Sequence, residues 1–302
     1  MDYENIIGTN MLKKVVIPVA GRGTRLLPTT KVQPKEMLPV FSSSKGDILL
    51  KPMVQLIFEQ LFDFGVRDFC FIVGKEKRAI KDHFSLNYPS LDDLSNKKNK
   101  ISFQDMKFFY KRIEKSNITW INQSNQLGYG HAVSLASSFV GKDDFILHAG
   151  DTLIVQPNNR HLIDLDKLSK RADCVVALEK ISEPSAYGVV VGKRTSKYSL
   201  PSNDKVYKIT QAVEKPSKKI SNLAIMALNK FTPDVMKILK KIPAGYGGEI
   251  QITDAIQHMV DSQMNVLGYE YHHSCTRLDI GTPDTYWHAQ QHSKKLASKG
   301  WM

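Results

Sequence analysis

The alternation of short apolar runs with segments of helical periodicity constrains the fold of this chain more than any other feature. Residues 13–20 (KKVVIPVA) form a β-branched run typical of a buried strand, and residues 52–64 then show helical periodicity. A strand-like run over 66–74 and a helix-like segment over 75–84 repeat the pattern, which continues as far as Asp151. This order predicts an α/β protein with a doubly wound, mixed but mostly parallel central sheet, whose ligands gather at the carboxyl ends of the strands.

The second half of the chain is richer in strands. Its strand-like runs are CVVALEKI, AYGVVVGKR, VYKITQAVE and LAIMALN, with helix-like TPDVMKILKKI and EIQITDAIQHMVDSQ after them. Thr282 and Pro283 suit the N-cap and first turn of a C-terminal helix. We expect a single domain with a first lobe over about 13–170 and a smaller β-rich lobe over about 171–302. The polar residues 86–100 predict a surface loop.

A stretch rich in glycine, proline and basic residues follows the first predicted strand: AGRGTRLLPTTKVQPKEMLP, from Ala20 to Pro39. Gly21 and Gly23 suit a turn whose N–H groups point at an anion such as a phosphate. The stretch contains neither G-x-G-x-x-G nor G-K-[ST], and its prolines oppose a continuous helix. We therefore predict an extended loop that folds basic side chains over a ligand; a solvated turn is the alternative. The basic residues are Arg22, Arg25, Lys31 and Lys35.

Composition places the chain among globular proteins and argues against several classes. Hydrophobic residues make up 42% of the 302 residues. The chain contains no run of about 18 apolar residues, so no membrane span is predicted. The N-terminal segment lacks an apolar h-region, which argues against a secretory signal, so a cytoplasmic location is expected. Cys70, Cys174 and Cys275 are odd in number and lack C-x-x-C spacing, so neither a disulfide framework nor a zinc site is predicted.

The net charge of +12 is compatible with nucleic acid or with an acidic substrate. The lysines occur in short scattered clusters, without a basic helix or an aromatic-interleaved RNA motif, which is typical of solvated faces. We therefore expect no nucleic-acid partner; a nucleic-acid binder is a rival interpretation that predicts a steep salt dependence.

Further motifs extend the pattern along nearly the whole chain. Besides AGRGTRLLPTTKVQPKEMLP they are QLGYGHAV, AGDTL, AYGVV, VEKP, SNLAI, GGEIQITDAI and DIGTPDTY. With these motifs in this order, the chain resembles the sugar-1-phosphate nucleotidyltransferases, in particular the bacterial-type UTP:glucose-1-phosphate uridylyltransferases. The resemblance implies a Rossmann-like nucleotidyltransferase fold with a nucleotide-binding and a sugar-binding lobe. It also implies Mg²⁺-dependent in-line transfer of a uridylyl group from UTP to glucose 1-phosphate, which yields UDP-glucose and pyrophosphate.

The resemblance assigns the glycine-rich stretch to the nucleotide. The backbone at Ala20 and Gly21 should contact the nucleoside. The β- and γ-phosphates should lie against Gly23, Thr24 and Arg25.

Four more residues complete the implied nucleotide site. Lys35 should bridge toward the α-phosphate and stabilise the transition state, and Glu36 should touch the nucleoside or hold a neighbouring base in place. Gln123 should read the base, because a carboxamide matches one donor and one acceptor on the uracil imide edge, while Gly128 supplies backbone contact. Thymine shares that edge, so Gln123 does not exclude dTTP; a buried structural glutamine is the alternative.

A metal site is implied at Asp151, which follows a strand-like run and a glycine. Mg²⁺ takes one or two carboxylates plus phosphate oxygens, so a single such carboxylate is sufficient. Together with Arg25 and Lys35, Asp151 makes up the implied catalytic set; a turn residue that caps the strand is the alternative. Asp279 resembles a second carboxylate near the metal. His148 is expected to pack, since Mg²⁺ prefers oxygen ligands.

The sugar 1-phosphate is assigned to the second lobe. Gly188 resembles a glycine whose backbone lies close to the sugar, and Glu214 with Lys215 resembles the pair that binds sugar hydroxyls and the sugar phosphate. Asn222 is placed in the same pocket. The alternative for the pair is an exposed ion pair at the end of a strand.

Two rival functions remain within this resemblance. A glucose-1-phosphate thymidylyltransferase would use dTTP with most of the same motifs. A non-catalytic sugar-nucleotide-binding relative should have lost Arg25, Lys35 or Asp151, all of which are present. The resemblance also implies a homo-oligomer, a dimer or a tetramer, without a membrane partner.

Overall fold

The computed structural model describes residues 12–86, 100–200, 202, 205–271 and 274–302. The loop predicted over 86–100 therefore lies, apart from its two ends, outside the described residues. Within those ranges, no helix combines the length and the apolar character that a membrane span requires.

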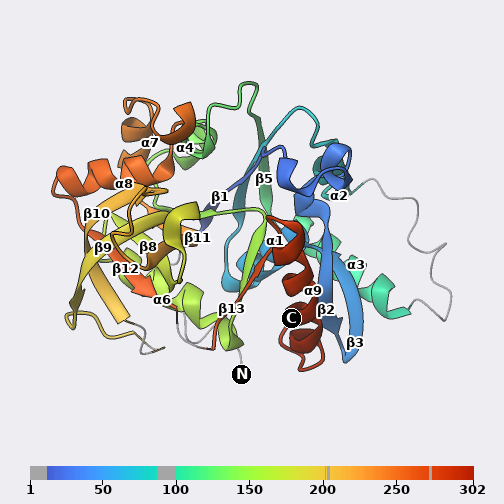
Figure 1. The fold of residues 1–302 in the computed structure, drawn as a ribbon. Helices are drawn as coiled ribbons and strands as arrows, with labels where there is room; N and C mark the ends of the chain where they lie inside the picture. Colours follow the sequence, from blue (N-terminus) through green and yellow to red (C-terminus); the bar gives the residue numbers. More distant parts are fainter. Residues whose placement is uncertain (1–11, 87–99, 201, 203–204, 272–273) are drawn as a thin grey trace.

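A large mixed sheet runs through the molecule. Its strands are β1 (Lys14–Val19), β4 (Asp68–Val73), β5 (Asn117–Asn122), β6 (Phe145–His148), β8 (Cys174–Lys180), β9 (Gly188–Thr195), β10 (Lys205–Glu214), β11 (Leu223–Phe231) and β12 (Val266–Glu270). They lie in the order β5-β4-β1-β6-β11-β8-β12-β10-β9 (Figure 1).

The direction of pairing changes partway across this sheet. The strands β5, β4, β1 and β6 are all parallel, as expected where helical crossovers connect them. Beyond β6, the strand β11 pairs antiparallel with β6, β8 and β9, while β12 and β8 are again parallel. The predicted α/β fold with a mixed sheet is confirmed, but the mostly parallel arrangement is limited to the strands between residues 14 and 148, because most of the later strands return through shorter connections.

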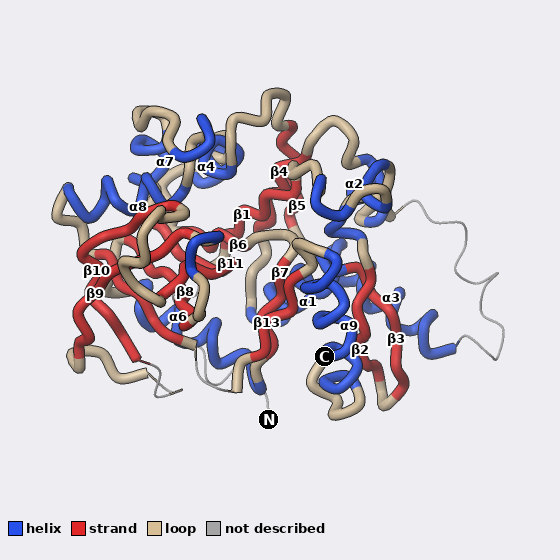
Figure 2. Tube along the Cα trace, viewed as in Figure 1, coloured by secondary structure: helices blue, strands red, loops and turns tan. Residues whose placement is uncertain are grey.

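Helices cover both faces of the sheet. They are α1 (Met53–Phe64), α2 (Arg78–His83), α3 (Lys100–Glu114), α4 (Tyr129–Ser134), α5 (Ser137–Val140), α6 (Arg160–Ser169), α7 (Asp234–Leu239), α8 (Ile252–Asp261) and α9 (Pro283–Ala297). Figure 2 shows the strands as a central layer with helices on its two sides. The single helix predicted over 131–140 is divided into α4 and α5.

Side chains of β1 alternate between two hydrophobic cores, because successive residues of a strand point to opposite faces. Val15, Ile17 and Val19 pack in a core with residues of α1, α3, α6 and α9, and Val16 packs in a second core with residues of α4, α7 and α8. All four side chains are fully buried. Burial of each stabilises the fold by about 1.5–3 kcal/mol relative to exposure, which fixes the strand that leads into the glycine-rich stretch.

Two small sheets were not predicted. The strands β2 (Pro39–Ser44) and β3 (Asp47–Pro52) form a hairpin whose turn residues, Lys45 and Gly46, both have positive φ. Two such residues suit a type I′ turn. The strands β7 (Thr152–Val155) and β13 (Thr276–Asp279) pair antiparallel, and their register sets Asp279 opposite Thr152. A segment near the C-terminus is thereby brought beside Asp151.

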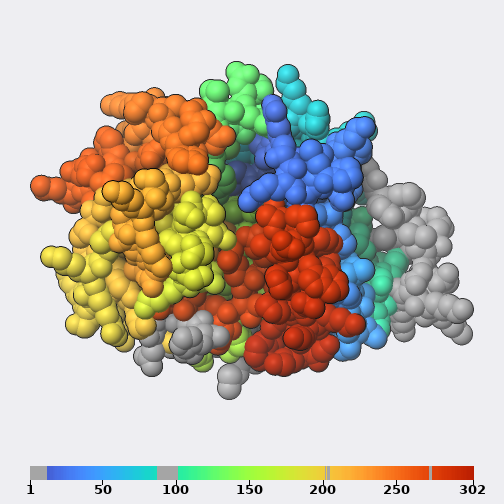
Figure 3. Space-filling view, in the orientation of Figure 1, coloured from blue at the N-terminus to red at the C-terminus, as the bar shows by residue number. Residues whose placement is uncertain are grey.

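The C-terminal helix α9 contacts the end of the glycine-rich stretch. Its predicted N-cap is confirmed: the Thr282 hydroxyl accepts from the backbone N–H of Thr285 at 3.2 Å. Tyr286 Oη donates to the carbonyl of Pro39, at the end of that stretch, at 3.0 Å. Figure 3 shows this helix in red directly beside the blue segment that contains the stretch.

Candidate active site

A cavity of about 330 Å³ opens at the carboxyl ends of β1 and β6. It gathers most of the residues predicted for the nucleotide, together with the residue predicted for the metal. The first are Ala20, Gly21, Gly23, Thr24, Lys35, Glu36, Gln123 and Gly128, and the last is Asp151. A second cavity of about 760 Å³ adjoins it across the glycine-rich stretch and shares several of its lining residues. In the space-filling view the molecule is hollowed between the blue segment and the green and yellow segments opposite (Figure 3).

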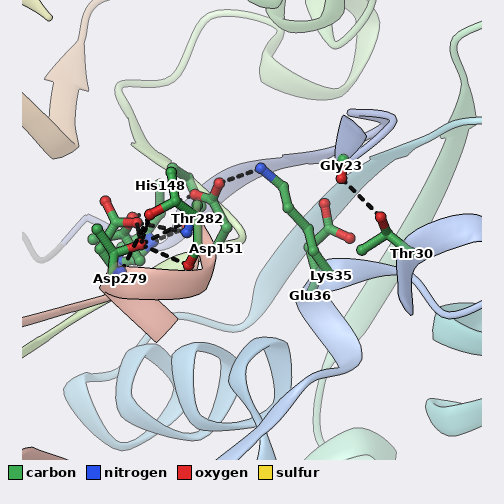
Figure 4. A network of polar contacts seen from close by, with 12 residues as sticks. Gly23, Thr30, Lys35, Glu36, His148, Asp151, Asp279 and Thr282 are labelled. Atoms are coloured by element: carbon green, nitrogen blue, oxygen red, sulfur yellow. Dashed lines mark hydrogen bonds and ion pairs between the residues drawn. The ribbon is translucent and has the colours of Figure 1, made fainter. Parts of the chain in front are cut away.

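The glycine-rich stretch is non-α-helical, as predicted, but it contains three short 3₁₀ turns, over Thr24–Leu26, Thr29–Lys31 and Lys35–Met37. Gly23 has φ of 67°, and a Cβ atom there would lie 3.2 Å from the Thr30 side chain. The Thr30 hydroxyl donates to the Gly23 carbonyl at 2.7 Å (Figure 4). This turn keeps the backbone open toward the cavity, where a side chain at position 23 would be strained.

Lys35 and Asp151 form an ion pair on the wall of the cavity. Lys35 Nζ lies 2.5 Å from Asp151 Oδ2, and the two side chains are 15% and 23% exposed (Figure 4). Burial alone would raise the pKa of Asp151, but the Lys35 ammonium, together with hydrogen bonds from the Thr152 hydroxyl and the backbone, outweighs burial and holds that pKa below its ordinary value. Burial likewise opposes the charge on Lys35, and Asp151 raises its pKa above the ordinary value. Both groups are therefore charged at neutral pH.

Asp279 lies next to Asp151 but outside the cavity lining. The backbone N–H of Ile280 donates to the Asp151 carbonyl at 3.1 Å. The Asp279 carboxylate accepts from the backbone N–H of Gly281 at 2.6 Å and from Arg277 Nη1 at 2.9 Å. Arg25 packs over this turn, since a Cβ atom on Gly281 would lie 3.4 Å from Arg25 Nη2. The structure thus brings the third predicted catalytic residue to the same turn as the predicted second carboxylate.

The donor set suits a metal that keeps phosphate and water ligands. Among the described residues there is no group of three or more His, Cys, Asp or Glu side chains that could hold a metal ion. Asp151 offers one carboxylate to the cavity, and Asp279 lies beside it, which matches Mg²⁺ with its one or two carboxylates. His148 is fully buried with Nδ1 against the Ala149 carbonyl at 2.8 Å, consistent with the packing role predicted for it.

Glu36 forms a second ion pair, beneath the glycine-rich stretch. Its carboxylate lies 2.7 Å from Lys77 Nζ, and the two residues are 2% and 7% exposed. Burial raises the pKa of Glu36, and the Lys77 ammonium opposes that shift. Glu36 thus contacts a neighbouring basic group, and it also lines the cavity, so its predicted contact with the nucleoside stays a prediction.

Gln123 is buried at the end of β5, with its carboxamide against the start of α4. Gln123 Nε2 lies 3.3 Å from the Gly128 carbonyl and 3.0 Å from His131 Nδ1. Gly128 has φ of 111°, and a Cβ atom there would lie 2.7 Å from the carbonyl of Ile250. Only glycine fits this close approach between the loop and the segment before α8.

Several residues of this site were not predicted. Gln126 Nε2 donates to the Ala20 carbonyl at 2.9 Å, and Arg22 Nε donates to Gln126 Oε1 at 2.6 Å. Gln126 therefore ties the loop after β5 to the glycine-rich stretch. Glu249 also lines the cavity. The signal for Gln126 was available as a second carboxamide in the loop that carries Gln123.

The residues predicted for the sugar, all between positions 188 and 222, lie outside the cavity of about 330 Å³. Glu214 pairs with Gly188 across β10 and β9, and its Oε2 accepts from the Thr253 hydroxyl at 2.7 Å. Lys215 has φ of 41°, which brings its Nζ within 3.7 Å of Glu214 Oε1. Adjacent side chains of a regular strand would diverge, so this left-handed residue gathers the pair. Asn222 is exposed, and its place in a sugar pocket stays a prediction.

Comparisons with known proteins agree with this geometry. The model of the family described as nucleotidyl transferase matches residues 14–295. The UTP–glucose-1-phosphate uridylyltransferase of Bacillus subtilis is 34% identical, over 89% of this chain and 87% of that protein. The structure resembles that of a UDP-glucose pyrophosphorylase complexed with UDP-glucose, with 30% identity, a TM-score of 0.78, and coverage of 94% of this chain and 99% of the other. It also resembles the UTP-bound enzyme of Acinetobacter baumannii, with 27% identity, a TM-score of 0.76, and 93% of each chain covered.

Proposed function

Because the chain belongs to the nucleotidyl transferase family, we propose that it transfers the uridylyl group of UTP to glucose 1-phosphate, yielding UDP-glucose and pyrophosphate. The observation that carries the proposal is that one cavity gathers the glycine-rich turn, the carboxamide of Gln123 and the Lys35–Asp151 pair. The sequence identity to the Bacillus enzyme, which covers most of both chains, supports the choice of substrates.

The attacking group needs no general base from the protein. A phosphate monoester has a second pKa near about 6, so a phosphate oxygen of glucose 1-phosphate is already anionic at neutral pH. The protein instead has to hold two polyanions in line and neutralise the charge on the leaving pyrophosphate. Basic side chains and backbone N–H groups around the cavity suit that task.

Lys35 has two alternative partners in this scheme. Here its ammonium neutralises Asp151, at 2.5 Å. When a triphosphate enters, the ammonium can turn to the α-phosphate, where charge builds up in the transition state. Arg25, beside the Gly281 turn, presents a planar guanidinium that matches two phosphate oxygens. The glycine backbone around Gly23 completes the cradle.

A divalent cation, Mg²⁺, held by Asp151 with Asp279 nearby, would neutralise charge on the triphosphate when bound. Release of Lys35 from Asp151 leaves that carboxylate free for such an ion. To metal binding this chain therefore contributes one carboxylate in the cavity, that of Asp151. The Lys35 ammonium is the cation that contacts this carboxylate in the structure.

The sugar end of the reaction belongs to the second lobe in this proposal, across the cleft from the nucleotide. Glu214 accepts hydrogen bonds from ring hydroxyls, and Lys215 meets the sugar phosphate as a point charge. The proposal also includes a homo-oligomer, a dimer or a tetramer, in the cytoplasm; light scattering after gel filtration measures its mass.

Pyrophosphate release with each nucleoside triphosphate against a panel of sugar 1-phosphates tests the function. We expect the highest kcat/KM with UTP and glucose 1-phosphate, and no turnover after EDTA until Mg²⁺ is returned. A higher kcat/KM with dTTP would make the protein a thymidylyltransferase. Absence of pyrophosphate with every pair would leave a non-catalytic binding protein and refute the proposal.

A further inference from the structure

The backbone at Gln123 is fixed independently of any ligand. Its N–H donates to the Val73 carbonyl at 2.8 Å, which continues the pairing of β4 and β5 by one residue. The residue is 4% exposed and lines both cavities at the glycine-rich stretch. These backbone contacts do not determine whether the oxygen or the NH₂ group of the Gln123 carboxamide faces a ligand.

The neighbours of the carboxamide determine that orientation. The Gly128 carbonyl can accept a hydrogen bond but cannot donate one, so the amide nitrogen of Gln123 must face it, at 3.3 Å. The second hydrogen of that nitrogen points at His131 Nδ1, at 3.0 Å. His131 therefore accepts at Nδ1 and carries its proton on Nε2. Both amide hydrogens of Gln123 are used, and its Oε1 has no partner among the residues that the structure describes. In this arrangement the carboxamide offers a base one acceptor only, and not the donor and acceptor that the sequence predicted, because the NH₂ group is bound to the start of α4.

The backbone of His131 is held in a position from which its Nδ1 can accept the hydrogen bond from Gln123. It lies on α4, whose start is attached to the segment before α8: the Gly130 N–H donates to the Ile250 carbonyl at 2.8 Å, and the Ile250 N–H donates to the Leu127 carbonyl at 2.8 Å. The Ser134 hydroxyl donates to the His131 carbonyl at 2.8 Å. The imidazole thus comes from a fixed backbone.

Gln123 presents an acceptor, Oε1, to the ligand, while its NH₂ group is already bound and offers no donor. This arrangement restricts which bases fit. Uracil presents an N3–H group, which donates to Gln123 Oε1. Cytosine presents a lone pair at N3, which faces the same oxygen without a hydrogen and leaves both acceptors unpaired. Thymine shares the N3–H group of uracil, so this contact treats UTP and dTTP alike.

We propose that His131 is a positioning residue that locks the Gln123 carboxamide with its oxygen toward the ligand, and thereby selects bases with an imide N–H over cytosine. The inference rests on the proposed function, since it assumes that the base lies against Gln123. It assigns to His131 an effect on base selection, whereas a packing role would affect all nucleotides equally.

Two substitutions separate these roles. In His131→Phe the ring remains but the acceptor is lost, so only the longer contact to the Gly128 carbonyl, at 3.3 Å, still favours this orientation of the carboxamide. A rotated carboxamide that presents its NH₂ group to cytosine N3 is then less disfavoured than in the wild-type protein. In His131→Asn the side-chain oxygen takes about the position of Nδ1 and accepts from Gln123, so the lock is kept. His258→Phe, an exposed histidine on α8, is the matched control.

The measurement is kcat/KM for UTP, dTTP and CTP at saturating glucose 1-phosphate, with Kd for UTP and CTP from calorimetry. We expect the UTP to CTP ratio to fall by about tenfold or more in His131→Phe, and to stay within about threefold of wild type in His131→Asn and His258→Phe. The UTP to dTTP ratio should not change in any of them. If His131→Phe is unfolded, His131→Ala takes its place.

An unchanged UTP to CTP ratio in the folded phenylalanine or alanine variant would overturn the inference, as would an equal loss for all three nucleotides. Equal loss of selectivity in His131→Asn would also overturn it. These outcomes leave uridylyl transfer by the wild-type protein intact, whereas failure of the proposed function appears as wild-type protein that neither binds nor uses UTP.

Discussion

Replacement of Lys35 by alanine removes the one ammonium group that contacts Asp151 in the described structure, at 2.5 Å. A unit charge about 4 Å from a second charge contributes about 4 kcal/mol at an effective dielectric constant of about 20. Loss of a contact formed in the transition state costs about 3–4 kcal/mol in known cases, or roughly 10²–10³ in rate. We therefore expect kcat to fall by roughly 10²–10³, with a smaller change in KM for glucose 1-phosphate.

The same substitution also changes the free energy of unfolding, so the two effects have to be separated. Breaking a fully buried pair costs about 3–5 kcal/mol, but Lys35 and Asp151 keep 15% and 23% exposure, so we expect roughly 1–3 kcal/mol. Lys237→Ala is the matched control: it removes a lysine from an exposed pair with Asp234 at 2.9 Å on α7, and should cost at most about 1 kcal/mol with unchanged kcat.

The assay is steady-state release of pyrophosphate, together with urea denaturation of each variant. A folded Lys35→Ala protein whose kcat lies within about threefold of wild type would refute the role given to Lys35. A loss of kcat as large in Lys237→Ala would refute the attribution to the cavity.

Three further predictions concern the metal, the sugar and pH. Asp151→Asn should raise the Mg²⁺ concentration that gives half-maximal rate, because an amide brings no charge; an unchanged requirement would contradict the metal site. Gly188→Ala should raise KM for glucose 1-phosphate with little effect on UTP, since its Cβ atom would lie 2.4 Å from the Thr253 hydroxyl; equal effects on both substrates would contradict the two-lobe assignment. Burial lowers the pKa of His148 to about 4 and of His161 to about 3, and the charge of His148 also lowers that of His161. Below about pH 6.5 these two histidines therefore bind protons in the unfolded chain but not in the folded one. The free energy of unfolding is highest above pH 6.5 and decreases as the pH falls toward 4. The decrease is up to about 1.4 kcal/mol per pH unit for each histidine. Denaturation curves from pH 8 to 4.5 measure the slope, and a flat profile would contradict it.

The backbone framework of the first lobe could be predicted because its signals are local. The β-branched run before Ala20 and the helical periodicity that ends at Gly65 needed no tertiary information, and Gly65 has the φ of 115° expected after a helix. The hairpin over residues 39–52 was missed because its Lys-Gly turn is a weaker signal than Asn-Gly or Asp-Gly. The strand-like runs after Cys174 were recognised as strands. Their antiparallel pairing was not predicted, because the direction of a strand depends on its connections rather than on its composition.

The motifs placed Lys35, Asp151 and Gln123 in one predicted site, and the structure gathers all three around one cavity, while their roles stay predictions. The contacts that orient these groups were not predictable, because they depend on how distant segments meet. His131 looked like part of a helix, yet its Nδ1 faces the Gln123 amide. Gln126 looked like a surface loop residue, yet it bridges to the Ala20 carbonyl across more than 100 positions of sequence.

Phosphorus NMR of the wild-type protein with UTP, glucose 1-phosphate and Mg²⁺ tests the central claim most directly, because it identifies both products in one spectrum. Uridylyl transfer predicts that UDP-glucose and pyrophosphate appear in equal amounts, and that added pyrophosphate regenerates UTP from UDP-glucose. Formation of UMP or inorganic phosphate without UDP-glucose, or no change with folded protein, would contradict the proposed reaction.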